Sequence, residues 1–490
     1  MRDFPLLIGG REVAGELAPI ESVNPYNQEA WARFANASPA QVEQAIAAAR
    51  AAFEGPWRQV NGGQRAQLLN ALADALVRQA RRMGEIETID NGKVIRETER
   101  QMHFAARNYR FFAGQADKLY GSTIPLDNPN LFDYTLREPA GVCALLVAWN
   151  SPVQLLTNKL APALAAGCTV VIKPSEYASA TLVELGRMAQ EVGFPAGVIN
   201  VVTGGAETGR ALTSSPNVDK ISFTGGVETA RHIAAAAARN LKPLTLELGG
   251  KSPNIVFEDA NLPAAVSGAL AGIFGAAGQS CISGSRLLVQ ESVYAQVAGQ
   301  VAERARAIRL GDPLLAETEM GPVANQAQFE RVLGFIESGR RGGARLLAGG
   351  APAREGDRAR GYFIQPTVFG DASGEMEIAQ EEIFGPVLTV IPFRDEEHAI
   401  AIANGTRYGL ASGIWTQSLA RAHRVARRLE AGTVWVNTYR TNAAQAPFGG
   451  VRDSGYGRER GLEALLEYTH VKNVMVDLAS DVGDPFAMRI

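Results

Sequence analysis

The sequence predicts an α/β protein in which a doubly wound parallel sheet is followed by a second α/β unit. Two observations carry this prediction. From residue 141, short runs that are apolar throughout alternate with helix-like segments, and strands that are apolar on both faces are typical of parallel sheets covered by helices. A second alternating series begins near residue 264. The 490 residues are 46% hydrophobic and 20% charged, which suits a globular chain of two or three domains.

The segment before residue 141 is predicted to be mostly helical over its first hundred or so residues. Ser38 is a candidate N-cap and Gly55 a candidate stop for one helix. The amphipathic run 63–87 predicts a second, longer helix. Residues 118–139 alternate between polar and apolar around an Asp-Asn-Pro-Asn turn, which predicts a protruding hairpin.

The two alternating series supply the sheets. In the first series the strand-like runs are 141–149, 168–175, 198–204, 220–226 and 243–250, and the helix-like runs are 153–167, 179–193 and 227–240. The second series runs through a helix (264–279), a strand (285–292), a helix (294–308), and on through 382–393 and 432–437. Doubly wound sheets bind ligands at the carboxyl ends of their strands, so the loops after the first series are candidate binding sites.

Charge and hydropathy exclude several classes of function. A net charge of −3 leaves no global electrostatic footprint for nucleic acid or an anionic membrane surface. The apolar patch at the N-terminus is too short for a signal peptide, and no apolar run approaches the ~20 residues that span a bilayer. We therefore expect a soluble, cytoplasmic protein with no nucleic-acid or membrane partner.

The three cysteines, Cys143, Cys168 and Cys281, are odd in number and far apart, which favours a reducing compartment over a disulfide framework. Cys143 and Cys168 lie in or beside apolar runs, where a cysteine usually behaves as a small hydrophobe. Cys281 stands among small and hydroxyl residues in GAAGQSCISGSR, so it is either a core residue or a nucleophile. Metal-type spacings such as C-x-x-C or H-E-x-x-H do not occur, and we expect no metal site.

Two strand ends carry residues that could bind a dinucleotide, and a third carries a residue that could act as a catalytic base. In VIKPSE, Glu176 could accept hydrogen bonds from a ribose with Lys173 beside it, or the two could form a surface pair. In FTGG, Gly225 and Gly226 could let backbone N–H groups approach a pyrophosphate, or could simply make a tight turn. Glu247 ends an apolar strand and is either paired in the core or a base.

Seven motifs taken together go further. AWNSP, KPSE, FTGG, LELGGKSPNIVF, GQSC, EEIFGPV and PFGGVRDSGYGRE, in this order across almost the whole chain, resemble the aldehyde dehydrogenase superfamily. The resemblance implies a nicotinamide-cofactor-binding domain (1–117 and 139–248), a catalytic domain (249–450) and a small β element for oligomerisation (118–138 and 466–490). It also implies a small-molecule aldehyde substrate and a homodimer or homotetramer.

The resemblance assigns catalytic roles. Cys281 matches the nucleophile, and Asn150 matches the residue whose amide, with the Cys281 backbone N–H, stabilises the oxyanion. Glu247 matches the base that activates water to hydrolyse a thioester. Lys159 and Glu459 match residues near the proton-relay path of the family.

The resemblance also implies the cofactor NAD. NADP is the less favoured cofactor because Glu176 would repel a 2′-phosphate. Glu382 would hold the ribose hydroxyls and Phe384 would pack against the nicotinamide. Gly226 departs from the pattern, since the family usually has a serine there. The expected cofactor-binding residues are Trp149, Lys173, Ser175, Glu176, Thr224, Gly225, Gly226, Leu248, Glu382 and Phe384.

The substrate is the least determined feature. Motif alignment places five residues on the substrate tunnel: Ser151, Asn158, Arg440, Asn442 and Phe448. Several of these positions are commonly aromatic in relatives that take apolar aldehydes. Polar residues here suggest a polar aldehyde, such as a semialdehyde whose carboxylate meets Arg440, unless Arg440 faces solvent or a neighbouring acid.

Two other functional classes remain as alternatives on this fold. One is a cysteine-dependent ester hydrolase, although no Cys–His pair is recognisable. The other is a non-catalytic binding protein, against which the joint presence of Cys281, Glu247 and Asn150 argues. Acyl transfer to coenzyme A is disfavoured because it does not need the water-activating Glu247.

Overall fold

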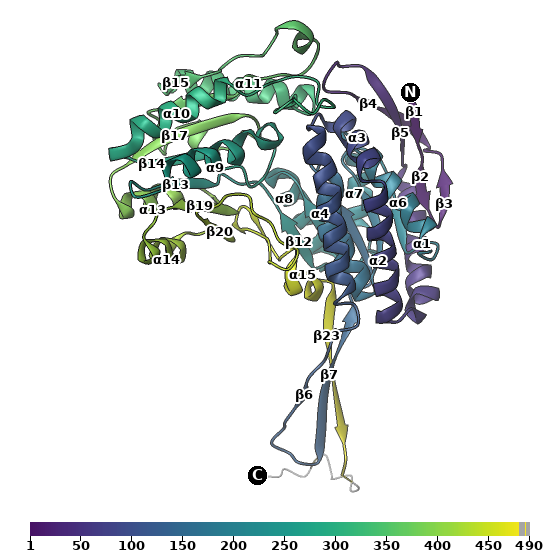
Figure 1. Cartoon of the computed structure of the whole chain (residues 1–490). Coiled ribbons are helices and arrows are strands. Elements are labelled where there is room, and N and C mark those ends of the chain that lie inside the picture. The colour runs from purple at the N-terminus through teal and green to yellow at the C-terminus, as the bar shows by residue number, and fades with distance from the viewer. Residues whose placement is uncertain (480–485, 487–490) are drawn as a thin grey trace.

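The computed structural model describes residues 1–479 and 486. Two α/β parts, each built on one large sheet, lie side by side, and a narrow β element protrudes from the body (Figure 1). In the described part of the chain, none of the helices has the length and apolar character that crossing a membrane requires. The mixed architecture with two parallel-rich sheets confirms the predicted α/β fold class.

The first large sheet has eight strands in the order β22-β12-β11-β8-β9-β10-β2-β3. Its five central strands are parallel, and antiparallel strands from distant parts of the chain close both edges. The strands are β2 (Leu6–Ile8), β3 (Arg11–Val13), β8 (Val142–Leu146), β9 (Thr169–Lys173), β10 (Ile199–Val201), β11 (Lys220–Thr224), β12 (Leu244–Glu247) and β22 (Gly455–Tyr456). The helices that follow them are α5 (Pro152–Ala166), α6 (Ala180–Glu191), α7 (Ala206–Ser214) and α8 (Val227–Arg239). These elements confirm the first alternating series.

The N-terminal region differs from the mostly helical prediction. Besides β2 and β3, its first 36 residues form a three-stranded sheet of β1 (Arg2–Phe4), β4 (Leu17–Val23) and β5 (Ala30–Asn36). β1, β2 and β3 have three residues each, too few to show alternation, and the seven-residue β4 and β5 were missed as well. The next prediction is confirmed: Ser38 caps α1 (Pro39–Glu54), its Oγ accepting the Gln41 N–H at 3.2 Å, and the helix ends at Gly55.

The predicted helix 63–87 is wrong in one respect, because it is two helices. α2 (Gly62–Arg78) and α3 (Ala80–Asn91) meet at Gln79, and α4 (Ile95–Ala113) packs on both. The buried positions continue with helical spacing through Leu76, Ala80 and Met83. Since the apolar pattern is unbroken, it could not indicate that one helix ends and the next begins at Gln79. A 3₁₀ turn, η1 (Pro56–Gln59), precedes α2.

The second large sheet has seven strands in the order β15-β16-β17-β14-β13-β19-β20, parallel except at β15. The strands are β13 (Pro253–Val256), β14 (Arg286–Gln290), β15 (Arg345–Ala348), β16 (Thr367–Gly370), β17 (Val387–Phe393), β19 (Ala411–Trp415) and β20 (Thr433–Val436). The helices are α9 (Leu262–Phe274), η2 (Gly275–Gly278), η3 (Glu291–Val293), α10 (Tyr294–Arg306), α11 (Gln326–Arg341), η4 (Gly356–Arg360), α12 (Glu377–Gln380), α13 (Glu396–Asn404) and α14 (Leu419–Arg428). The last helix, α15 (Gly461–Glu467), packs on α5 of the first part. A short ladder joins β18 (Tyr408–Gly409) to β21 (Val451–Arg452). The second alternating series is thereby confirmed.

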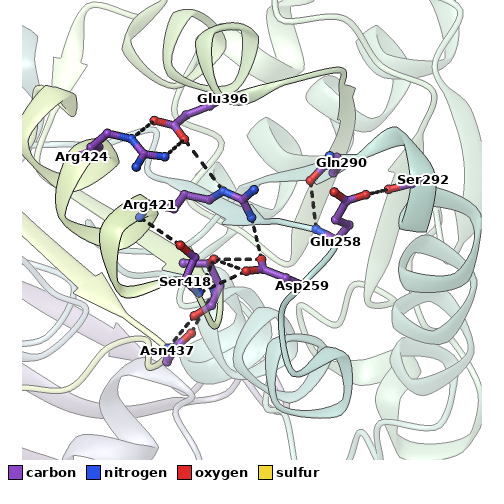
Figure 2. A network of polar contacts seen from close by, with 10 residues as sticks. Glu258, Asp259, Gln290, Ser292, Glu396, Ser418, Arg421, Arg424 and Asn437 are labelled. Carbon is purple, nitrogen blue, oxygen red and sulfur yellow. Dashed lines mark hydrogen bonds and ion pairs between the residues drawn. The ribbon is translucent and has the colours of Figure 1, made fainter.

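A network of polar contacts fixes the loops at the carboxyl ends of β13, β19 and β20 (Figure 2). Asp259 accepts hydrogen bonds from Arg421 Nη1 at 2.8 Å and from the Ser418 N–H at 3.1 Å, and Arg424 makes a two-point contact with Glu396. Cys281 precedes β14 and so lies at the opposite, amino-terminal edge of this parallel sheet. The network therefore stabilises the scaffold rather than taking part in chemistry.

The protruding element is a three-stranded antiparallel sheet of β6 (Thr123–Ile124), β7 (Leu131–Pro139) and β23 (Thr469–Asp477) (Figure 1). The predicted hairpin is confirmed, and β23 pairs along the whole of β7. Residues 480–485 and 487–490 of the predicted oligomerisation segment lie outside the described residues. The domain boundaries themselves stay a prediction.

Candidate active site

One cavity lies at the carboxyl ends of β8, β9 and β11, the edge where parallel sheets bind ligands. We call it the sheet-edge cavity, and its volume is about 820 Å³. Its wall includes seven of the residues expected to bind a cofactor: Trp149, Lys173, Ser175, Glu176, Thr224, Gly225 and Gly226. Residues from the ends of three strands that are neighbours in the sheet thus converge on one space.

The acidic residue at this cavity is Glu176. Its Oε2 lies 3.5 Å from Lys173 Nζ, and its side chain stays 38% exposed, so the carboxylate can still accept hydrogen bonds from a ligand. Lys173 is buried, and burial lowers the pKa of its ammonium group. Pairing with Lys173 and binding of a ribose are therefore compatible, because the Glu176 carboxylate can contact Lys173 and still accept hydrogen bonds from ribose hydroxyls.

The two glycines after β11 have different roles. The Gly225 N–H donates to the Glu247 carbonyl at 3.2 Å, so this N–H is not free for a phosphate. A Cβ at Gly225 would come within 2.3 Å of the Phe223 ring, whereas a Cβ at Gly226 would meet nothing within 4 Å. Gly226 is the N-cap of α8 and leaves open space at a helix N-terminus.

A second cavity contains the thiol. This Cys281 cavity has a volume of about 1070 Å³ and is lined by both Cys281 and Asn150. All five residues expected on the substrate tunnel also line it: Ser151, Asn158, Arg440, Asn442 and Phe448. The structure therefore brings the expected nucleophile, oxyanion donor and tunnel residues together.

The loop before Cys281 is tightly constrained. The helix predicted over 264–279 ends at Phe274, and Ala276 and Ala277 follow with left-handed φ values of 55° and 52°. A Cβ at Gly278 would lie 2.0 Å from the Gly385 carbonyl oxygen, so only glycine fits this approach. Asn150 Nδ2 donates to the carbonyl of Gln279 at 3.0 Å, which ties the amide to the loop that carries the thiol.

The electrostatics at Cys281 disfavour its thiolate in the ligand-free protein. Burial, followed by the charges of Glu382 and Glu247, raises the pKa of the thiol to about 12. The charge of Arg460 acts in the opposite direction. A base is therefore needed to ionise the nucleophile near neutral pH.

Glu247 is a buried carboxyl group whose two oxygens have no hydrogen-bond partner among the described residues. Burial and then the charge of Glu459 raise its pKa well above the usual range, while the charge of Lys159 lowers it. Lys159 and Glu459 form an ion pair, and both side chains are buried. Three ionisable groups from α5, β12 and the C-terminal loop thus act on one another.

The remaining expected cofactor residues lie outside the walls of both cavities. Leu248 is buried directly after β12. The Gly250 N–H donates to Glu382 Oε1 at 3.1 Å, and burial raises the pKa of Glu382 to about 7. The Phe384 ring packs edge-on against Trp149 with centroids 5.3 Å apart. This contact joins the loops of the two large sheets.

A family model described as the aldehyde dehydrogenase family matches residues 13–474. The chain belongs to the aldehyde dehydrogenase family. It is 46% identical to the "(Z)-2-((N-methylformamido)methylene)-5-hydroxybutyrolactone dehydrogenase" of Acinetobacter baylyi over 100% of both chains. It superimposes on a putative aldehyde dehydrogenase from Burkholderia cenocepacia with a TM-score of 0.97, 41% identity and 100% coverage of both chains. An NAD+ complex of an aldehyde dehydrogenase from Bacillus cereus gives a TM-score of 0.95 at 41% identity, covering 98% of this chain and 97% of that one.

Within this aldehyde dehydrogenase, Arg440 is committed to the scaffold. Its Nη1 donates to the Ala271 carbonyl at 3.1 Å, in the last turn of α9. A Cβ at Gly275 would lie 2.3 Å from the same Nη1, so the guanidinium is packed over the end of that helix. A cation at a helix C-terminus is favoured by the helix dipole.

Several cationic residues were not predicted from the sequence: Lys93, which contacts the wall of the Cys281 cavity, and Arg96, Arg100, Arg304, Arg309 and Arg460, which line it. Buried Lys93 donates from Nζ to Ser151 Oγ at 2.9 Å and to Gln101 Oε1 at 2.6 Å. Arg460 lies on the cavity wall next to Glu459 in the chain. The only sequence signal for Arg460 was its place directly after the glutamate of the GRE motif. Within the described residues, no group of histidine, cysteine and acidic side chains could hold a metal ion.

Proposed function

We propose that this aldehyde dehydrogenase oxidises an aldehyde to the carboxylic acid with reduction of NAD, through a thioester on Cys281 that is hydrolysed by water activated by Glu247. The observation that carries the proposal is the buried Glu247 carboxyl, which lacks a hydrogen-bond partner among the described residues and lies close enough to influence the Cys281 thiol. An unpaired buried carboxyl costs free energy, and carboxyls with strongly raised pKa values are concentrated at functional sites.

Different side chains carry out the successive steps of the reaction. The Cys281 sulfur forms a bond to the aldehyde carbon as its thiol proton is lost, and the Asn150 amide with the Cys281 backbone N–H donates to the oxyanion. Such a donor typically contributes ~10²–10³ in rate. The carbon then loses a hydride and becomes a thioester; a bound nicotinamide supplies the hydride acceptor. Water adds to the thioester, the sulfur leaves, and the carboxylic acid is released.

Proton movement is assigned to Glu247. A raised pKa makes its ionised form a stronger base, which suits both removal of the thiol proton and activation of water. The buried Lys159–Glu459 pair adjusts that basicity, consistent with its place near the proton path of the family.

The residues around the sheet-edge cavity fit a dinucleotide. The Thr224 hydroxyl is buried and has no partner among the described residues, and the space above Gly226 is open at a helix N-terminus. Glu176 would accept from a free 2′-hydroxyl and repel a 2′-phosphate, so we propose a preference for NAD over NADP. Measurement of kcat/KM with both cofactors tests this, and equal or greater efficiency with NADP contradicts it.

The catalytic assignment is tested by two substitutions. Cys281→Ala should abolish turnover, and Glu247→Gln should give a burst of reduced cofactor and then stall at the thioester. Cys143→Ala is the matched control, since Cys143 is buried in β8 away from both cavities. Steady turnover at the wild-type rate in Cys281→Ala or Glu247→Gln would overturn the proposal.

We further propose that the aldehyde is polar, with a semialdehyde as the specific class. Ser151, Asn158 and Asn442 make part of the Cys281 cavity polar. The name of the Acinetobacter baylyi relative points the same way, because a 5-hydroxybutyrolactone is the ring-closed form of an aldehyde that bears a carboxylic acid. Arg440 is one candidate for the carboxylate, although its Nη1 already donates to Ala271.

The protruding element supports the proposal of a homodimer or homotetramer. Large apolar side chains are exposed on β7 and β23, where they would be costly in a monomer: Phe132, Leu136, Val471, Met475 and Val476. A monomeric mass by light scattering at micromolar concentration would contradict this.

We also propose that the protein is cytoplasmic. The three cysteines support this location, because all three are free.

A further inference from the structure

Arg460 is a buried cation in the Cys281 cavity, with only 5% of the residue exposed. Its Nε donates to Asn158 Oδ1 at 3.2 Å and its Nη1 donates to Asn442 Oδ1 at 2.7 Å. The guanidinium also lies over two rings, 5.3 Å from the centroid of Phe104 and 4.9 Å from that of Phe448. All four contacts are with neutral groups, so the positive charge is held without being neutralised.

The neighbouring carboxylates Glu459 and Glu247 act on this charge from a distance, but neither forms an ion pair with it among the described residues. Glu459 is the next residue in the chain, but its side chain is paired with Lys159. In the part of the chain that the structure describes, Arg460 forms no ion pair and its Nη2 has no hydrogen-bond acceptor. A buried arginine without a counter-charge is costly for the free protein, and an anion that enters the cavity removes that cost.

The orientation of the guanidinium is fixed by its amide partners. Asn108 Nδ2 donates to Asn158 Oδ1 at 2.7 Å, and Asn442 Nδ2 donates to the Arg440 carbonyl at 3.1 Å. Both amides therefore present their oxygens to Arg460. A guanidinium that is already oriented loses little freedom on binding and offers the geometry that matches a carboxylate.

The whole cavity has an excess of positive charge. Its wall carries six arginines and two glutamates, which are Arg96, Arg100, Arg304, Arg309, Arg440 and Arg460 against Glu97 and Glu319. Glu319 is already engaged by Arg309 at 3.2 Å. The field in the cavity therefore attracts anions.

We infer that Arg460 binds a carboxylate carried by the aldehyde substrate and so positions the aldehyde carbon at Cys281. The inference rests on the proposed function, and it names the substrate class as aldehydes bearing a second, anionic group. Arg460, rather than Arg440, is the specificity residue, because Arg460 is buried and oriented by two amides, whereas Arg440 is only partly buried and is held by one hydrogen bond to the Ala271 carbonyl.

Another role for Arg460 must be separated from this one. Its charge lowers the pKa of the Cys281 thiol, so it could act only by favouring the thiolate. That role would affect every aldehyde equally. Anion binding affects only substrates that carry a carboxylate.

The first experiment compares straight-chain ω-carboxy aldehydes with n-alkanals of equal length on wild type, Arg460→Met and Arg440→Met. A hydrogen bond to a charged group implies a loss of roughly 10–150-fold in kcat/KM for the carboxy aldehydes in Arg460→Met, with little change for the alkanals. Arg440→Met should change the ratio much less. An equal loss for both substrate types in Arg460→Met, or an unchanged ratio, overturns the inference.

The second experiment needs no turnover and no cofactor. Glutarate should protect Cys281 of the wild type from iodoacetamide, whereas the neutral diamide glutaramide should not. Asn442→Leu, which keeps Arg460 but removes one amide that orients it, should weaken the protection if Arg460→Met does not fold. Absence of protection by glutarate in the wild type overturns the inference. Protection in an enzyme that oxidises no aldehyde would instead sustain the anion site while refuting the proposed function.

Discussion

The buried ion pair of Lys159 and Glu459 can be tested in two independent ways, by the stability of the folded protein and by the pH dependence of thioester hydrolysis. The two residues are 300 positions apart, and their side chains are 0% and 3% exposed. Replacing one of them, by Lys159→Met or Glu459→Gln, leaves the other charge buried without its partner. Such a loss typically costs about 3–5 kcal/mol.

The double substitution Lys159→Met with Glu459→Leu removes both charges together. Buried pairs replaced by apolar residues are often neutral or stabilising, so the double variant should recover most of the stability lost in the single variants. Thermal unfolding of the four proteins at one protein concentration measures this. A double variant whose loss equals the sum of the two single losses would refute the reasoning.

The same pair predicts a change in the pH dependence of hydrolysis. Glu459 raises the pKa of Glu247, and Glu459→Gln removes that charge while Lys159 continues to lower the pKa. The ionised Glu247 is the active form, so the acid limb of the hydrolysis rate should move to lower pH. Single-turnover measurement of acid release from the thioester across pH tests this. An acid limb that stays in place or moves to higher pH contradicts the assigned role.

Three further predictions concern the cofactor site and the nucleophile. Gly226→Ser should tighten NAD binding about tenfold or more, because the open space at the N-terminus of α8 would receive a hydroxyl that can donate to a phosphate. Such a hydrogen bond contributes about 1.5–3 kcal/mol, and the control Gly226→Ala should bind NAD as the wild type does. NAD affinity measured by calorimetry should fall as the pH drops below about 7, where Glu382 becomes protonated, and Glu382→Gln should remove that dependence. Alkylation of ligand-free Cys281 should still accelerate above pH 9, because burial raises the pKa of the thiol to about 12, and a plateau below pH 9 would contradict this.

Local patterns revealed most of the fold. Apolar runs that end at Leu146, Lys173, Thr224 and Glu247 are long enough to identify as buried parallel strands, and the spacing between them leaves room for the crossover helices. What was missed had no local signal. The three-residue β2 joins the first large sheet by pairing with β10, almost two hundred residues later, and β3 follows it as the edge strand.

In the candidate site, too, some features could be predicted from the sequence and others could not. Motif order predicted Cys281 and Asn150 as partners in one site, and both line the Cys281 cavity, since each lies in a loop of recognisable composition. Sequence patterns did not show that the Gly225 N–H is taken by the Glu247 carbonyl, because that bond depends on the pairing of β11 with β12. Backbone pairing across a sheet is invisible in a linear pattern.

The sequence by itself determined the α/β class and the family and predicted the set of reactive groups, because each of these is written in residue types at short spacing. Only the tertiary structure decided how deeply each charge is buried and which groups hold it. Arg440 and Arg460 look alike in the sequence, yet one is bound to the carbonyl end of α9 and the other is held by two neutral amides inside the Cys281 cavity. The physical reason is that the interaction of a charge depends on burial and on distances to groups far away in the chain, and folding sets both.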